Sequence, residues 1–406
     1  MKTISQIKII LDDNIICSFK TERVSLLNSF NRVLAKDIIS DINMPNFSKS
    51  AMDGYACISN DVFSNQLKVI DTVYAGRPPK KEIKHRECSR IMTGAMIPKG
   101  ADCVVILEDV KKNLDDRISV LSDKIQLYNL NNKFAYKNLN IINEGNDFRK
   151  GDLILTKGTL LKSQHIALLA SIGYDNVDVN VQPIVGVLST GSELVEPGNM
   201  LEPTKIYNSN GYNILADILT VNVKFKYYGI VSDDRKKTLH IIKKAMKETD
   251  ILIISGGVSI GDKDVVIDCM DECNMNIIFR KVAMKPGKYF TFARCNDFVC
   301  FGLPGNPVAT FVLFNFFIKS YLIKMMSCCE NILDNEFFLE IGEDMSFVNV
   351  DRDLIIPIYI KDGQVFCTKY YGSSHIHAYR DTKYVALIPT GTTKLEKGTK
   401  IYVRHI

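Results

Sequence analysis

The first part of the chain carries apolar residues at three- and four-residue spacing. The runs "ISQIKIILDDNI" and "VSLLNSFNRVLAKDI" both show this spacing. Because it is the period of an amphipathic α-helix, both runs are predicted to be helical, and together they cover most of residues 1–40.

At Met44–Pro45 the pattern changes. Up to about residue 140 the chain consists of short β-branched runs, such as "LKVIDTVY", "DCVVILEDV", "RISVLS" and "KIQLYN", separated by Gly, Pro, Asn and Asp. Runs of this kind, bounded by turn residues, indicate strands, so we expect an all-β insertion here. A helix is then predicted at about Ser163–Ile172.

Strand-like and helix-like runs alternate from Pro183 onwards. In chain order they are "PIVGVLST", "NGYNILADILTVN", "VKFKYYGIV", "RKKTLHIIKKAMKE", "DILIIS", "DKDVVIDCMDEC" and "NIIFRKVAM". A βαβ succession predicts a parallel sheet covered by helices on both faces. Asn208 or Ser209 is the expected cap of the first of these helices. Beyond residue 335, short strands with turns favour a small C-terminal β-barrel or sandwich.

The most apolar run, "VATFVLFNFFIKSYLIKMM", is interrupted by Asn315, Lys319 and Lys324. A membrane span needs about 20 nearly uncharged residues, so we interpret this run as a buried core helix, roughly residues 307–326. The N-terminal run "MKTISQIKIILDDN" has no apolar core followed by a small-residue cleavage site. No signal peptide is therefore expected.

Composition and charge narrow the class of protein. The length of 406 residues suggests two to four domains, and 46% hydrophobic with 24% charged residues is typical of soluble globular proteins. The net charge of +5 is spread along the chain and does not indicate nucleic-acid binding. The 11 cysteines form no C-x-x-C pair and no zinc array with the 6 histidines, which indicates free thiols and a cytoplasmic protein. His375 and His377 alternate as neighbours on one strand face would.

The loop "ISGGVSIGDKD", residues 254–264, lacks both the dinucleotide fingerprint and the Walker phosphate loop. It follows a predicted strand and precedes a predicted helix, where glycines let backbone N–H groups approach a ligand. Asp262 and Asp264 would repel a bare phosphate unless a divalent cation lies between them. Alternatively, Asp262 merely caps the helix.

Two further loops leave the same predicted sheet with similar side chains. "VLSTGSELVEPG" brings hydroxyls and a carboxylate, Glu193, and "YYGIVSDDRKK" brings Asp233 and Asp234. The carboxyl ends of parallel strands meet at one edge of a sheet. The three loops together therefore predict a crevice for a phosphorylated ligand with Mg²⁺.

Other stretches are informative only in combination with these loops. In "MKPGKYFTFA", Lys285 and Lys288 flank a Pro-Gly turn that would aim two ammonium groups at a compact anion, although paired lysines are usually solvated. In "FGLPGNPVATF", Gly305 and Asn306 open the long helix. The polar stretches "FSKSAMDGYA" and "SRIMTGAMIPKGADCVVILED", taken alone, could be tight turns.

The chain resembles the MoeA / gephyrin E-domain family, the molybdopterin molybdenumtransferases. The matching motifs occur in the family's order: "PNFSKSAMDGYA", "AGRPP", "RIMTGAMIPKGADCVVILED", "GNDFRKGD", "STGSELVEPG", "SNGYNILADIL", "GIVSDD", "SGGVSIGDKD", "MKPGK" and "GLPGNPV". They cover nearly the whole chain.

The resemblance implies a multidomain fold of α/β and β parts. Its core would be a three-layer, parallel-sheet molybdopterin-binding domain at 176–326, similar to the molybdopterin adenylyltransferase fold. An elongated helical and β segment would combine 1–43 with 140–175, an inserted β domain would span 44–139, and a β-barrel 327–406. The resemblance also implies a homodimer whose site lies between the α/β domain of one subunit and the insertion of the other.

The implied reaction inserts molybdate into adenylylated molybdopterin and releases AMP with Mg²⁺. The resemblance gives catalytic roles to Asp53, Thr93, Glu193, Asp233 and Asp264, of which Glu193, Asp233 and Asp264 would organise the metal. It gives substrate contacts to Ser50, Ser189, Thr190, Gly191, Ser255, Gly256, Gly257, Ser259, Gly305 and Asn306. It assigns binding of the molybdate oxyanion to Lys285, Lys288, Arg352, Ser373 and Ser374. Contacts with a molybdopterin adenylyltransferase and with apo-molybdoenzymes are expected, but none with nucleic acid or membrane.

The sequence departs from the family pattern in two places. Ser48 and Lys49 replace a common Asp-Asn pair, and Pro357 stands where relatives often carry a second arginine, so Arg352 would act alone or be a plain strand residue. Two alternatives also remain: a molybdopterin adenylyltransferase, which needs neither insertion nor barrel, and a non-catalytic gephyrin-like scaffold. The sequence does not separate molybdate from tungstate.

Overall fold

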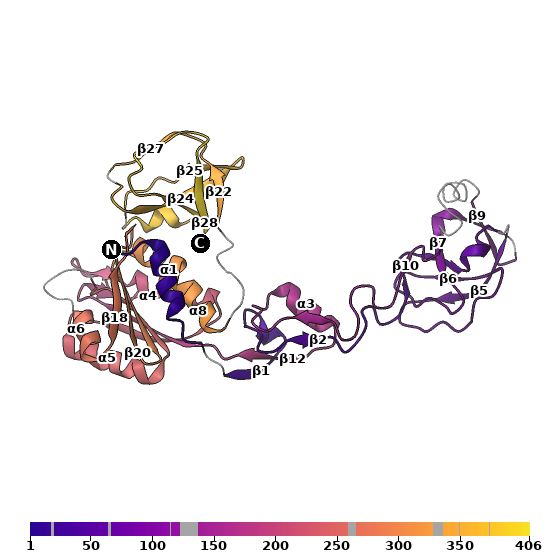
Figure 1. The fold of residues 1–406 in the computed structure, drawn as a ribbon, viewed down its shortest axis with the longest axis horizontal. Helices are drawn as coiled ribbons and strands as arrows, with labels where there is room; N and C mark the ends of the chain where they lie inside the picture. Colours follow the sequence, from indigo (N-terminus) through magenta and orange to yellow (C-terminus); the bar gives the residue numbers. More distant parts are fainter. Residues whose placement is uncertain are drawn as a thin grey trace. The chain divides into compact units, whose positions relative to one another are not determined.

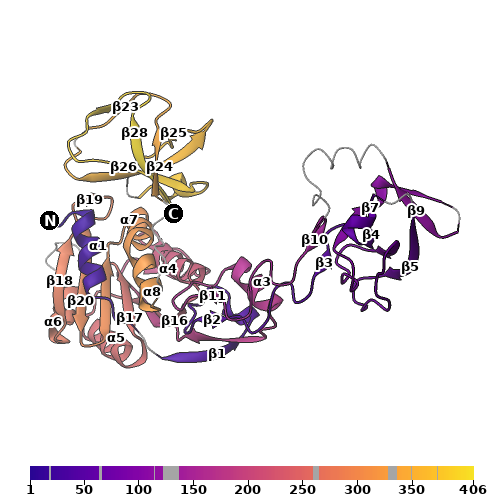
Figure 2. The same ribbon diagram turned by 45° about the vertical axis from the view of Figure 1, so that its right-hand side comes forward.

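The computed structural model describes residues 1–17, 20–63, 66–113, 115–121, 137–258, 265–327, 336–348, 350–372 and 374–406. The chain forms two compact units (Figures 1 and 2). The main unit contains Met1–Lys36, Lys157–Ala167 and Asp175–Ile406, and the insertion unit contains Asp37–Thr156 and Leu168–Tyr174. The finer domain boundaries expected above remain predictions.

A six-stranded sheet with the order β16-β13-β17-β21-β20-β18 forms the centre of the main unit. Its strands are β13 (Ile184–Thr190), β16 (Lys224–Val231), β17 (Ile251–Ser255), β18 (Asn276–Lys281), β20 (Tyr289–Cys295) and β21 (Phe298–Leu303). The first four strands of this order are parallel, and three of them, β16, β13 and β17, correspond to predicted strands. The prediction of a wholly parallel sheet is wrong, because β20, which the predicted strand runs do not include, lies antiparallel between β21 and β18. Only Asn296 and Asp297 separate β20 from β21, and a connection this short can join antiparallel strands but not parallel ones.

Helices cover both faces of this sheet. They are α1 (Ile4–Asp13), α4 (Ser209–Thr220), α5 (Arg235–Glu248), α6 (Val265–Glu272), α7 (Pro307–Leu313) and α8 (Lys319–Met325). Ile251 and Ile253 of β17 belong to the core shared with α1, α4, α7 and α8, whereas Leu252 and Ile254 belong to the core shared with α5 and α6. Successive strand residues point to opposite faces, so one apolar run serves two helical layers.

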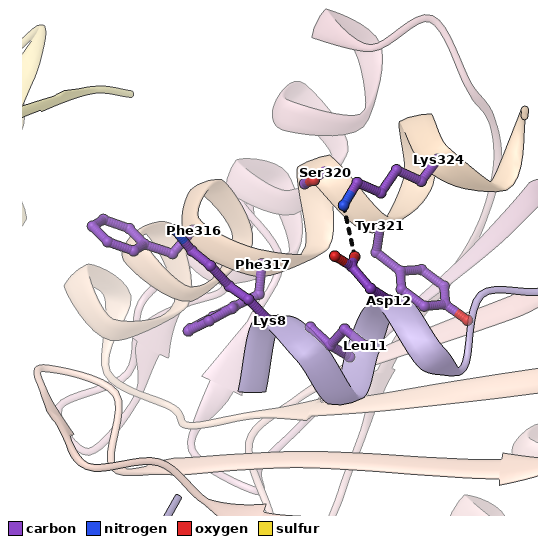
Figure 3. Close-up of a pocket in the computed structure, with 8 residues that line it drawn as sticks. All are labelled: Lys8, Leu11, Asp12, Phe316, Phe317, Ser320, Tyr321 and Lys324. Carbon is purple, nitrogen blue, oxygen red and sulfur yellow. Dashed lines mark hydrogen bonds and ion pairs between the residues drawn. The ribbon is translucent and has the colours of Figure 1, made fainter. Parts of the chain in front are cut away.

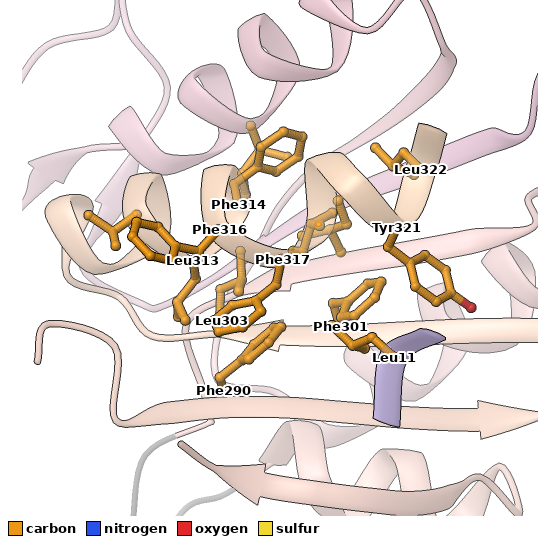
Figure 4. Close-up of a cluster of buried hydrophobic side chains, with 14 of the residues drawn as sticks. Leu11, Phe290, Phe301, Leu303, Leu313, Phe314, Phe316, Phe317, Tyr321 and Leu322 are labelled. Atoms are coloured by element: carbon orange, nitrogen blue, oxygen red, sulfur yellow. The ribbon is translucent and has the colours of Figure 1, made fainter. Parts of the chain in front are cut away.

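The first face is packed largely with aromatic rings (Figure 4). Phe290 of β20 stacks on Phe317 with ring centroids 5.3 Å apart, and Phe301 of β21 meets Tyr321 of α8 edge-on, also at 5.3 Å. Offset and edge-to-face pairs of this kind are favourable arrangements of buried rings. They fix the long helix of Pro307–Met325 against the sheet.

This helix is continuous from α7 to α8 but contains a π-helical turn at Phe314–Ile318. Among the described residues, Pro307–Met325 is the stretch long and apolar enough to cross a membrane by length and composition, yet 78% of its most apolar window is buried within the protein. The prediction of a buried core helix is therefore confirmed.

The N-terminal segment is helical only in its first half. The first apolar run predicts a helix, and α1 is found there. It begins with a capping box between Thr3 and Gln6. The second predicted helix is wrong: its start lies in strand β1 (Thr21–Ser25), which pairs with β12 (Asn176–Asn180). A short 3₁₀ turn at Leu27–Ser29 follows. Pairing with a strand distant in sequence decides this structure, and the local apolar spacing does not reveal it.

Helix α1 lies against α8, and polar side chains line a shallow depression between them (Figure 3). Lys324 Nζ lies 2.7 Å from Asp12 Oδ1, and the Tyr321 hydroxyl donates to the Asn14 carbonyl at 2.9 Å. Lys8 Nζ reaches Glu336 Oε1 at 3.0 Å. These contacts hold α1 to the rest of the main unit.

The C-terminal part of the main unit is a second six-stranded sheet, in which β25 pairs with β24 off the path β19-β24-β26-β28-β22. Its strands are β19 (Met284–Lys285), β22 (Glu336–Glu340), β24 (Asp353–Lys361), β25 (Gln364–Cys367), β26 (Tyr384–Ile388) and β28 (Lys400–His405). A separate pair joins β23 (Met345–Ser346) and β27 (Lys394–Leu395). The predicted strand content is confirmed. His375 and His377 do not alternate on a strand, because a 3₁₀ turn occupies Ile376–Tyr379.

The insertion unit is built on a third six-stranded sheet, β7-β4-β6-β5-β9-β8. Its strands are β4 (Gly54–Cys57), β5 (Leu67–Val73), β6 (Glu87–Ile91), β7 (Cys103–Ile106), β8 (Val110–Lys112) and β9 (Arg117–Val120). Shorter pairs join β3 (Lys49–Ser50) to β10 (Ile141–Ile142) and β2 (Ile38–Ile39) to β11 (Leu153–Leu155). Helix α3 (Ser163–Ser171) lies where the sequence predicts it. The β character of the insertion is confirmed for the described residues.

Candidate active site at the sheet edge

A cavity of about 310 Å³ lies in the main unit where β13 and β17 end. Its lining comes from these strand ends, from the first residues of α4 and α7, and from the loop after β25. The lining residues are Thr190, Glu193, Leu194, Ile206, Tyr207, Asn208, Ser209, Asn210, Ser255, Gly256, Gly305, Asn306, Pro307 and Ser374. The edge predicted from the sequence is thus the edge at which the cavity forms.

Glycines allow the ends of β13 and β17 to approach each other. Gly256 has φ +93°, and a Cβ there would overlap the Thr190 carbonyl oxygen. Gly257 has φ +66°, and its Cβ would lie 2.7 Å from Val266 Cγ2. Only glycine adopts both conformations without strain, so the two glycines are required by the backbone itself.

Asn210 connects three of the elements around the cavity. Its Nδ2 donates to Ser255 Oγ at 2.9 Å and to the Gly305 carbonyl at 2.8 Å. It therefore joins the start of α4 to the end of β17 and to the loop before α7. Asn208, two residues earlier, caps α4 through the Gly211 amide and donates to the Tyr227 hydroxyl at 2.8 Å.

The sequence did not single out Asn208 or Asn210 as ligand contacts. Asn208 was expected only as a helix cap, which is confirmed. The motif "SNGYNIL" contains Asn210 and directly follows Asn208, but an asparagine at a helix start is usually a cap. Only the packing of α4 against β17 and α7 reveals the second role of Asn210.

The predicted acidic residues separate in the structure. Glu193 lines the cavity, with its carboxylate over Gly191. The Asp233 carboxylate instead accepts hydrogen bonds from the Ser192 amide and hydroxyl, at 3.2 and 2.8 Å, so it holds the loop after β13. Asp234 caps α5. Asp264 lies outside the described residues.

These contacts show how many of the expected Mg²⁺ ligands face the cavity. In the described ranges no group of three His, Cys, Asp or Glu side chains could hold a metal ion. Of the expected ligands that are described, Glu193 faces the cavity and Asp233 is occupied by Ser192. The described residues thus supply one cavity carboxylate, which is less than a complete Mg²⁺ site.

Hydroxyl groups around the edge differ in exposure and in partners. Ser189 is fully buried, and its Oγ has no hydrogen-bond partner among the described residues. The Thr190 hydroxyl lies 3.5 Å from the Ser255 carbonyl. Ser374 lines the cavity, whereas Ser259 and Ser373 lie outside the described residues.

The predicted oxyanion residues form a second group. Strand β19 pairs with β24 next to Arg352 and so brings Lys285 to this segment. Arg352 Nε donates to Asp351 Oδ2 at 3.1 Å, and this bond, together with the charge of Lys285, holds the pKa of Asp351 below its usual value. Lys288 Nζ lies over the Tyr289 ring, 5.4 Å from its centroid. The described cavity lining includes none of these three cations.

Pro357, the departure from the family pattern, is buried within β24 and pairs with Val385 of β26. Its carbonyl accepts from the Thr368 amide at 3.1 Å. No second arginine is available at this position.

The insertion unit carries its own polar site. Asp53 Oδ1 accepts from the Thr93 amide at 2.6 Å and from the Thr93 hydroxyl at 2.7 Å. These two bonds, with a weaker contribution from Arg90, lower the pKa of Asp53. Ser50 is buried, and its hydroxyl donates to the Met52 carbonyl at 2.6 Å. Asp53 and Thr93 therefore form an exposed pair, while Ser50 holds the turn that presents it.

The fold and the cavity define an α/β domain with a ligand-binding cavity at the carboxyl edge of its sheet. Residues 3–173 match the family model "MoeA N-terminal region (domain I and II)", and residues 186–324 match "Probable molybdopterin binding domain". A Bacillus subtilis molybdopterin molybdenumtransferase is 34% identical, over 96% of this chain and 91% of its own length. A Staphylococcus aureus protein of the same name is 37% identical over 76% of this chain and 72% of its own length.

The structural comparison agrees. The Pyrococcus horikoshii molybdopterin biosynthesis MoeA protein matches with a TM-score of 0.80 and 28% identity, covering 100% of both chains. The chain therefore belongs to the MoeA family of molybdopterin molybdenumtransferases, enzymes of molybdenum cofactor biosynthesis.

Proposed function

We propose that this enzyme inserts molybdate into adenylylated molybdopterin and releases AMP in a Mg²⁺-dependent reaction. The observation that supports it best is the cavity at the carboxyl edge of β13 and β17, lined by Glu193, Asn210 and Ser255 and bordered by two helix starts. A concave site with a few convergent polar groups at this edge of an α/β sheet is typical of nucleotide-like ligands.

In this proposal one group of residues binds the adenylylated pterin and another binds molybdate. The cavity binds and orients the adenylylated pterin, and the cations Lys285 and Arg352, with Lys288 and Ser374, bind the molybdate oxyanion by charge-assisted hydrogen bonds. Mg²⁺, when bound, would shield the negative charge of the phosphoanhydride as its bond breaks. Among the described carboxylates, Glu193 of the cavity would be its ligand. The protein's own contribution is positioning and exclusion of water.

The test is AMP release from adenylylated molybdopterin by the purified protein, with and without molybdate and Mg²⁺. We expect release that depends on both, and a drop of about a hundredfold or more in Glu193→Gln. The matched control is Glu202→Gln, an exposed glutamate nine residues further along the chain. Tungstate in place of molybdate measures the preference between the two oxyanions.

Other results would reject the transferase. ATP-dependent adenylylation of free molybdopterin would show an adenylyltransferase. Binding of the adenylylated pterin without any release of AMP would show a scaffold. Full activity of Glu193→Gln would show that the cavity carboxylate takes no part in the reaction.

We further propose that the active form is a cytoplasmic homodimer, in which the insertion of one subunit supplies Asp53 and Thr93 to the site of the other. Asp53→Asn and Glu193→Gln would each be inactive as homodimers. Random co-assembly of the two variants would then restore about a quarter of wild-type activity, since half of the dimers carry one intact site. Failure to restore activity in a verified mixed dimer would contradict the shared site.

A further inference from the structure

One buried oxygen of a cavity-lining residue is an acceptor that lacks a donor. Asn210 is 9% exposed and lines the cavity, and its Oδ1 has no hydrogen-bond partner among the described residues. The orientation of the amide is not arbitrary. The Gly305 carbonyl can only accept, so the Asn210 atom 2.8 Å from it must be the nitrogen, and the other atom must be the oxygen.

A donor lies beside this acceptor. Ser255 Oγ accepts from the same Asn210 Nδ2 at 2.9 Å, so its own O–H proton points elsewhere. No hydrogen bond from this hydroxyl to another described residue is present, and Ser255 also lines the cavity. The two side chains therefore present an acceptor and a donor next to each other.

Leaving such a pair buried and unmatched is unfavourable, because an unsatisfied buried polar group loses its hydrogen bonds to water. A ligand relieves this cost only if it presents a donor and an acceptor in the reverse order. A phosphate group cannot, since it carries no N–H donor at neutral pH and would face the Asn210 oxygen with negative charge. An amino group beside a ring nitrogen can.

We propose that Asn210 Oδ1 and the Ser255 hydroxyl recognise an aminopyrimidine-type edge of the substrate: Asn210 accepts from its N–H and Ser255 donates to its adjacent ring nitrogen or carbonyl. This inference rests on the proposed function, because adenylylated molybdopterin carries such an edge on both its adenine and its pterin. It assigns Asn210 and Ser255 to base specificity rather than to phosphate binding.

The test uses two pairs of ligands that differ at this edge, measured by calorimetry with the wild-type protein. AMP is compared with purine riboside monophosphate, which lacks the amino group, and hydroxymethylpterin with hydroxymethyllumazine, in which an oxo group replaces it. We expect the amino member of one pair to bind about tenfold more tightly or better. The pair that discriminates identifies which end of the substrate occupies this part of the cavity.

Variants then assign the discrimination to residues. Asn210→Ala should bring the affinity ratio of the discriminating pair close to one. Ser255→Ala should instead weaken binding without abolishing the discrimination, because its hydroxyl donates to the adjacent ring nitrogen or carbonyl and not to the amino group. Asn213→Ala is the control, since Asn213 lies one turn further along α4 and donates to Asp217. It should keep the wild-type ratio.

Equal affinities within both pairs, or binding of none of the four ligands to the wild type, would overturn the proposal. The wild-type comparison stands even if Asn210→Ala does not fold. Molybdate-dependent AMP release is measured separately, so a protein that releases AMP but does not discriminate refutes this inference and leaves the proposed function intact.

Discussion

Asp53 illustrates how a single exposed carboxylate is kept ionised. Its pKa is lowered by the amide and hydroxyl of Thr93, which donate only to the charged form. Thr93→Ala removes the hydroxyl and keeps the amide, so the pKa of Asp53 should rise toward its ordinary value. Carboxyl ¹³C chemical shifts followed against pH measure it. Thr93→Ser keeps the hydroxyl and should leave the pKa low; an equal rise in both variants would contradict the assignment.

Gly256 is a position where one methyl group should be costly. With φ +93°, an added Cβ would be strained and would overlap the Thr190 carbonyl. Gly256→Ala is expected to lower the free energy of unfolding by about 2 kcal/mol or more. Gly305→Ala is the control, because nothing lies within 4 Å of a Cβ there. Urea denaturation compares the two, and equal stability would mean that the loop relaxes.

Asp217 on α4 should make stability depend on pH in the opposite direction to a typical aspartate. Burial raises its pKa to about 6, although Lys319, Asn315 and Asn213 partly oppose the shift. The folded state then binds the proton more tightly than the unfolded state, so stability is greatest below about pH 4 and falls as pH rises to about 6. The loss is at most about 3 kcal/mol.

Asp217→Asn should remove this loss, which denaturant unfolding at several pH values measures. The exposed Asp271→Asn on α6 is the control and should keep the wild-type pH profile. A wild-type profile in Asp217→Asn would show that another group titrates.

At the scale of elements, the π-helical turn is stabilised by a side chain from the C-terminal sheet. Arg404 of β28 donates to the Asn315 carbonyl at 2.9 Å and to the Phe316 carbonyl at 3.3 Å, and its guanidinium lies over the Phe316 ring at 4.4 Å. A π-helical turn interrupts the regular i→i+4 hydrogen bonds, and here a buried arginine donates to two carbonyls of that turn.

Arg404→Met removes the hydrogen bonds to these two carbonyls and the ion pair of Arg404 with Glu336. We expect the free energy of unfolding to fall by about 3 kcal/mol. Arg380→Met removes an exposed arginine, paired with Asp381, and should change stability by less than about 0.5 kcal/mol. Thermal unfolding distinguishes them; similar small losses in both would mean that water satisfies the carbonyls.

At the scale of the whole molecule, the insertion behaves as a module with adjacent ends. The Met44 amide donates to the Phe148 carbonyl at 2.8 Å, so the chain enters and leaves the β domain at one place. Between these ends lies a separate core that includes Tyr55, Leu67 and Ile118. A domain with its own core and neighbouring termini can fold independently.

Residues 43–149 expressed alone should therefore give a β-type circular dichroism spectrum and a cooperative unfolding transition. Residues 43–121, which lack β10 and the closing hydrogen bond, should be less stable. The absence of a cooperative transition in the longer fragment would show that the insertion needs the rest of the chain.

The sequence by itself determined the succession β13, α4, β16, α5 and β17 and the edge of the sheet that carries the cavity. Apolar runs bounded by Gly, Pro and Asn are local signals, and the carboxyl ends of β13 and β17 follow from them. It also placed Glu193 and Ser255 at this edge, because the carboxyl ends of parallel strands meet there.

Only the tertiary structure decided which of these side chains are available to a ligand. Asp233 resembles Glu193 in the sequence, but Ser192 occupies its carboxylate. The run after Val24 has helical spacing, but β1 pairs with a strand more than a hundred residues away. Asn210 reads as an ordinary helix-start residue until α4 packs against β17. Hydrogen bonds between distant segments carry no local signature, so partner and exposure are properties of the folded chain alone.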